Sequence, residues 1–171
     1  MTILQLGGRA HASPTSLGRA ASALGALDAF SFWVVPADHR SAGDLIVVGT
    51  TGGFLIRVCD RQGRFDLSGG IPAIDHRAIP GLRGVRSAAK GVRGTLGRAS
   101  VFIDVEPVVC LTDAVGGAPV TAKDVRFVHV RDLAGDLSAR PRILEQGRAQ
   151  RGARALGVKL AGDHKRHFTM G

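Results

Sequence analysis

Short runs rich in β-branched and aromatic residues recur along the chain, and they predict strands. The predicted strands are Phe30–Val35, Asp44–Gly49, Phe54–Cys59, Ser100–Leu111 and Val125–Val130. The second and third runs are separated only by Thr50–Gly53, which contains two glycines, so this pair predicts a β-hairpin. The second half of Ser100–Leu111 is almost wholly apolar, which predicts a buried central strand.

Apolar residues at helical spacing predict helices between these strands. The first helix runs from a cap at Thr15 or Ser16 to about Leu27, and the others are Leu82–Leu96, Asp132–Leu137 and Leu144–Leu156. Residues 60–81 are polar and rich in glycine and proline, so we expect a long loop there, and residues 38–43 predict a turn. The order of elements predicts the α/β class, with a mixed central β-sheet flanked by helices.

The length of 171 residues suits one domain with its own core. We expect a flexible leader at 1–14, the domain at 15–156 and a basic tail at 157–171. No apolar run reaches the roughly 18 residues of a membrane span, and the first residues lack a charged region followed by an apolar one. We therefore expect no membrane partner and a cytoplasmic location.

The charge is strongly positive, with 23 Lys and Arg against 14 Asp and Glu, a net charge of +9. Arg83, Arg86, Lys90 and Arg93 of the predicted helix Leu82–Leu96 fall within about 80° of arc at 100° per residue. Such a row predicts contacts to a nucleic-acid backbone, with DNA expected rather than RNA. The alternative interpretation is a solvated face whose arginines reflect biased composition. With 5% aromatic residues and no Tyr, stacking platforms for single strands are not expected.

The predicted hairpin also carries a recognisable order of residues. Asp44-Leu45-Ile46-Val47-Val48-Gly49, Gly53 to Cys59 and Gly63-Arg64-Phe65 follow one another, and Pro107–Leu111, Asp132-Leu133 and Arg140–Leu144 continue the pattern. In this order and spacing the chain, from about Leu17 to Leu156, resembles the nuclease-related domain (NERD) family of the PD-(D/E)xK superfamily. The resemblance implies a restriction-endonuclease-like fold and metal-dependent cleavage of phosphodiesters, in which carboxylates hold Mg²⁺.

Most of the polar positions of that family pattern are changed in this chain. Asp44 matches the metal-binding Asp, whereas Arg57 stands at the family's Glu, Cys59 at its Lys, and Gly84 at or near its helical Gln. An arginine at a Mg²⁺ site reverses the local charge, so Arg57 is expected to pair with Asp44 in place of the metal. The resemblance therefore implies a domain that has lost catalysis, a pseudoenzyme with no cofactor, that keeps a basic surface for nucleic acid.

Two alternatives stay open. Glu106 or Asp104 on the next strand would restore a Mg²⁺-dependent nuclease if it joined Asp44, or the domain serves as a scaffold for protein partners. Cys59 and Cys110 are too few for a Cys-only zinc site or a disulfide framework. Because Cys59 lies between Arg57 and Arg61, we expect a lowered thiol pKa.

Overall fold

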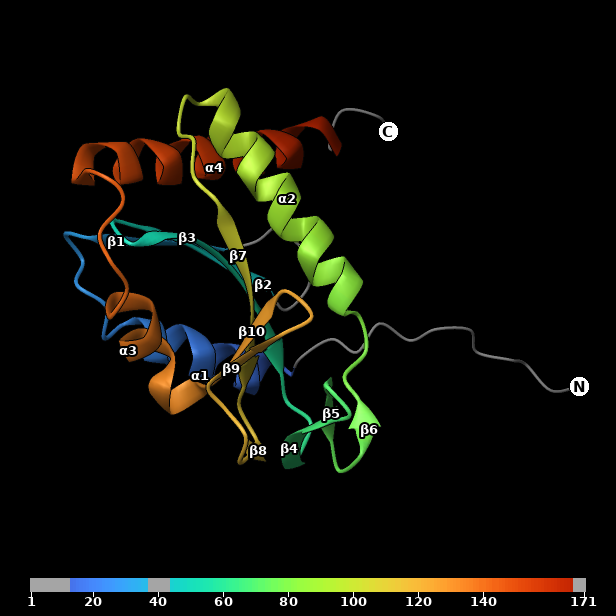
Figure 1. Cartoon of the computed structure of the whole chain (residues 1–171). Helices are drawn as coiled ribbons and strands as arrows, with labels where there is room; N and C mark the ends of the chain where they lie inside the picture. The colour runs from blue at the N-terminus through green and yellow to red at the C-terminus, as the bar shows by residue number, and fades with distance from the viewer. Residues whose placement is uncertain (1–12, 37–43, 168–171) are drawn as a thin grey trace, which may run out of the picture.

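The computed structural model describes residues 13–36 and 44–167, the last ten of these by backbone alone. A six-stranded mixed sheet lies at the centre, with strand order β1-β2-β3-β7-β10-β9 (Figure 1). These strands are β1 (Phe32–Pro36), β2 (Asp44–Gly49), β3 (Gly52–Cys59), β7 (Val105–Leu111), β9 (Val120–Ala122) and β10 (Val125–His129). β3, β7 and β10 run parallel to one another, and the remaining pairs are antiparallel.

Helices cover both faces of this sheet. They are α1 (Pro14–Leu24), α2 (Leu82–Arg98), the 3₁₀ turn η2 (Val130–Asp132), α3 (Leu133–Ser138) and α4 (Gln146–His167). Figure 1 shows α2 and α4 together on one side and α1 and α3 on the other. The expected class, a mixed β-sheet flanked by helices, is confirmed. Within the described ranges no helix is long and apolar enough to cross a membrane.

Two hydrophobic cores lie on the two faces because successive residues of a strand point to opposite sides. Leu55 of β3 and Val109 of β7 belong to the core under α2 and α4, whereas Phe54 and Ile56 belong to the core over α1 and α3. β7 is central, and Val108 to Leu111 are all buried, as the apolar run predicts.

The close approach of β1 to β2 depends on a glycine. Gly49 is paired with Phe32, and a Cβ on Gly49 would lie 2.2 Å from the Phe32 ring. The ring therefore occupies the space that any side chain at position 49 would need.

The expectation of a long loop at 60–81 was wrong. This segment forms β4 (Gly63–Ser68), β5 (Ile71–Ile74) and β6 (Arg77–Ala78), which with β8 (Ala114–Val115) make a second sheet in the order β6-β5-β4-β8. Gly69 and Gly70 join β4 to β5 with φ of 59° and 78°, values suited to the two-residue hairpin turn that twisted strands favour. The glycines marked a tight hairpin turn inside the segment.

Several boundaries also differ from the expectations. The cap of α1 is Ser13, whose hydroxyl accepts from the Ser16 backbone N–H, and Pro14 is the first helical residue. β7 begins only at Val105, and α4 continues to His167 through most of the segment expected to be a tail. The predicted turn at 38–43 lies outside the described residues, as does most of the predicted leader.

Candidate functional site

Asp44 and Arg57 face each other across the β2–β3 hairpin, where they are paired in register. The Arg57 Nε donates to Asp44 Oδ1 and Nη2 donates to Oδ2, both at 2.7 Å. The Asp44 side chain is 1% exposed and the Arg57 side chain 31%. This bidentate geometry is the strongest that an arginine and a carboxylate form, because both oxygens receive a charge-assisted hydrogen bond. The pairing expected from the sequence is confirmed.

The remaining arm of the guanidinium reaches the start of α2. Arg57 Nη1 donates to the Gly81 carbonyl at 3.5 Å, and a Cβ on Gly84 would lie 3.5 Å from the same nitrogen. The arginine head thus lies beside the position at or near which the resemblance places a Gln. A cavity of about 140 Å³ adjoins the head, and Cys59, Ile79 and Val85 are among the residues that line it.

Asp44 and the residues beside it do not make a site suited to Mg²⁺. Both Asp44 oxygens are bonded to the guanidinium, and a hard divalent cation needs several free oxygen ligands. Across the described ranges, no group of three or more His, Cys, Asp or Glu side chains is placed to hold a metal ion. The donor set present at the hairpin therefore favours an ion pair over a metal.

Cys59 differs from the expectation of a lowered thiol pKa. Burial raises the pKa of Cys59, and the nearby Arg61 only partly opposes this effect. Burial also raises the pKa of Cys110 to about 12. Both cysteines are free, and they belong to the cores on opposite faces of the sheet. The thiol of Cys59 is therefore less acidic than that of an ordinary cysteine, which disfavours the reactive thiolate form.

The structure does not bring Asp104 or Glu106 to Asp44. β7 does neighbour β3, but Glu106 is aligned with Phe54, three residues along the strand from Arg57. An odd spacing also places Glu106 on the opposite face of the sheet. Asp104 precedes β7 and pairs with Arg93 of α2 at 2.9 Å.

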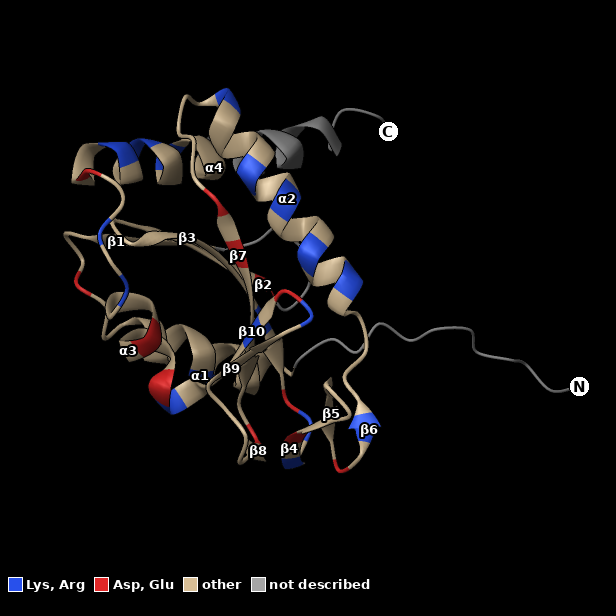
Figure 2. Cartoon of the chain, in the orientation of Figure 1, with Lys and Arg blue, Asp and Glu red and all other residues tan. Residues whose placement is uncertain are grey.

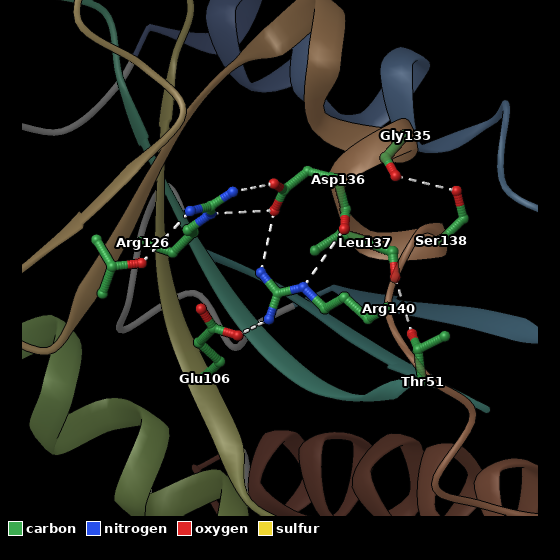
Figure 3. Close-up of polar contacts among 9 residues, drawn as sticks. Thr51, Glu106, Arg126, Gly135, Asp136, Leu137, Ser138 and Arg140 are labelled. Atoms are coloured by element: carbon green, nitrogen blue, oxygen red, sulfur yellow. Dashed lines mark hydrogen bonds and ion pairs between the residues drawn. The ribbon is translucent and has the colours of Figure 1, made fainter.

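Glu106 belongs instead to an ionic network on the α3 side of the sheet (Figure 3). Arg126 and Arg140 both bind Asp136, and Arg140 also pairs with Glu106. The Arg140 guanidinium lies 5.0 Å from the centre of the Phe54 ring, and burial lowers the pKa of this arginine. Two cations and two carboxylates balance one another, so this cluster joins β7, β10 and α3 without free charge.

The sequence alone does not indicate this network. Arg140 lies in the motif Arg140–Leu144, and Arg126 lies within the predicted strand Val125–Val130. The strand register that aligns these residues is long-range, and nothing in the local pattern signals it.

The four cations of α2 lie along its outer face, as Figure 2 shows by the row of blue bands on that helix. The residues around them enclose a groove of about 540 Å³, whose other walls include Pro107 and Val105 of β7. Arg93 pairs with Asp104, and Arg86 lies 3.4 Å from Asp124. No acid interrupts the row within the helix, but two neighbouring segments supply one each.

Comparisons with known proteins add no relatives: no family model, no curated protein and no solved structure matches this chain. The resemblance to the nuclease-related domain family accordingly stays a prediction.

Proposed function

We propose that this chain is a nucleic-acid-binding domain of restriction-endonuclease-like architecture that has lost catalysis, similar to nuclease-related domains. The observation that carries the proposal is the groove along α2, with Arg83, Arg86, Lys90 and Arg93 on its wall. Aligned cations beside a groove suit a polyanion whose charges are also regularly spaced.

The length of the row fits a nucleic-acid strand. From Arg83 to Arg93 the helix advances ten residues, or about 15 Å at 1.5 Å per residue. One DNA strand carries a phosphate every ~3.4 Å along the helix axis, so the row spans roughly four nucleotides.

The two acids beside the groove do not block such binding. The Asp104 and Asp124 side chains are 86% and 90% exposed, and ion pairs between exposed side chains contribute little stability. A phosphate can therefore replace either carboxylate at small cost.

The loss of catalysis is proposed from the hairpin. Arg57 occupies the position that the resemblance assigns to a metal-binding Glu, and it forms hydrogen bonds with both oxygens of the one carboxylate that is kept. The guanidinium supplies positive charge at this point, but it is not a Lewis acid and cannot lower the pKa of a coordinated water as a metal ion would.

Fluorescence anisotropy with labelled DNA at two salt concentrations, with and without Mg²⁺ or Mn²⁺, tests the proposal. Changing the four α2 cations together to Ser should weaken binding and lower the salt slope by up to about 3.6, since each phosphate contact contributes about 0.9. The matched control changes four exposed arginines outside α2, also to Ser: Arg64, Arg77, Arg131 and Arg142. Equal losses in both variants would show that only total charge matters.

A gel of the same samples tests the alternatives. Intact DNA with salt-sensitive binding supports the proposal. Metal-dependent cleavage that Asp44→Ala abolishes would support the nuclease with a relocated acid. Neither binding nor cleavage would leave the scaffold interpretation.

A further inference from the structure

Phe102 is the most exposed of the large apolar side chains in the described part of the chain, at 83%. It lies in the extended segment between α2 and β7, where Val101 and Ile103 on either side are buried in the core. The two buried neighbours fix the segment. Because successive side chains of an extended segment point to opposite sides, the Phe102 ring points to solvent. Nothing in the packing of the described residues explains why an aromatic ring is exposed at this position.

The ring lies at one end of the basic row of α2. At 100° per residue, Gly97 falls in the middle of the arc occupied by the four cations, about one turn beyond Arg93. A Cβ on Gly97 would lie 3.9 Å from two atoms of the Phe102 ring. The Phe102 ring therefore follows the cations on the same side of the helix. Asp104, two residues further along the segment, lines the groove itself.

We infer that Phe102 stacks against an unpaired base of a single-stranded nucleic acid whose phosphates lie along the four α2 cations. This inference rests on the proposed function and names the form of nucleic acid that the groove prefers. A basic track beside an exposed aromatic ring is the combination by which proteins hold single strands. A base in the interior of a blunt duplex is stacked on both sides and offers no face to the ring. The low aromatic content of the whole chain does not oppose this interpretation, because one well-placed ring suffices for one base.

The experiment compares a single-stranded oligonucleotide that carries 2-aminopurine with a blunt duplex of the same sequence. Affinity is measured by anisotropy, and stacking by quenching of the 2-aminopurine fluorescence. We expect Phe102→Ala to weaken single-strand binding at least about fivefold and to abolish the quenching. Duplex affinity and the salt slope should be unchanged, because stacking releases no counterions. Phe102→Trp should retain both single-strand affinity and quenching.

Phe30→Ala is the matched control, since Phe30 is a 75% exposed phenylalanine in the segment that joins α1 to β1. It should leave every measurement unchanged. If Phe102→Ala binds single strands as the parent protein does while the α2 variant loses binding, the stacking inference is overturned and the proposed function stands. Equal weakening on single strands and duplex would also overturn it. Absence of binding by the parent protein would overturn both.

Discussion

Arg57 gives the sharpest test of how the hairpin is stabilised. Arg57→Met keeps most of the aliphatic stem but removes the guanidinium, leaving the Asp44 carboxylate buried without its two 2.7 Å donors. Removing one partner of a buried ion pair costs about 3–5 kcal/mol. We expect a value near the lower end, about 3 kcal/mol, because 31% of the Arg57 side chain is exposed and water can reach the vacated position.

Urea titration followed by tryptophan fluorescence measures this loss. Trp33 is the single tryptophan of the chain, and it lies on β1, paired directly with the strand that carries Asp44. For a chain of this size, about 3 kcal/mol corresponds to a fall in Tm of roughly 6–12 °C.

The double variant Asp44→Leu/Arg57→Met provides the control. Replacing a buried ion pair by apolar side chains is often neutral or stabilising, so the double variant should recover most of the stability. Unfolding of Arg57→Met at the same urea concentration as the parent protein would show that the ion pair does not stabilise the hairpin. The single variant Asp44→Leu completes the cycle. If the double variant loses as much stability as Asp44→Leu and Arg57→Met together, the two residues are energetically independent and the ion pair does not stabilise the hairpin.

Three further results are expected. The free energy of unfolding should fall as the pH rises from about 9 to 12, because burial raises the pKa of Cys110 to about 12 and the thiol ionises more readily in the unfolded chain. Cys110→Ala should reduce the difference between the urea midpoints measured at pH 8 and at about pH 10.5. Gly49→Ala should cost about 1–3 kcal/mol by forcing Phe32 aside, whereas Gly18→Ala in α1, with open space around it, should stabilise by about 0.5–1 kcal/mol on thermal melting. Asp136→Ala should lower the free energy of unfolding, measured by urea titration, by about 3 kcal/mol, because two half-buried arginines lose the carboxylate that they share.

The sequence predicts the central hairpin, α2 and the buried strand well because local patterns dominate there. Asp44 lies at the start of one β-branched run and Arg57 near the end of the next, so a short turn suffices to align them. The same local logic failed at residues 60–81, where the strands are short, lie among polar and glycine residues and pair mainly with one another. Their hairpin turn depends on positive φ at two glycines, which also fits an irregular loop.

The environment of individual side chains was harder to predict. For Cys59, sequence proximity to two arginines suggested an electrostatic effect, but the depth of the strand in the fold decides the pKa. For Asp104 and Glu106, the alternative of a relocated acid depended on whether the next strand lies beside the hairpin. β7 does lie beside β3, but its register aligns Glu106 with Phe54 and not with Arg57. The pKa and the register both depend on how distant segments pack, and the pattern along the chain does not contain them.

Because of the two exposed carboxylates beside the α2 groove, a ligand must displace an existing ion pair before it binds Arg86 or Arg93. Asp104 and Asp124 already partner Arg93 and Arg86, so an incoming ligand competes with carboxylates of the same chain. A single carboxylate that binds Arg86 or Arg93 exchanges one exposed ion pair for another, so its net gain at that arginine is small. A phosphate backbone brings denser negative charge and displaces both acids at once. Because each displaced ion pair is exposed and weak, the groove favours a ligand that places several negative charges along the row over a single carboxylate.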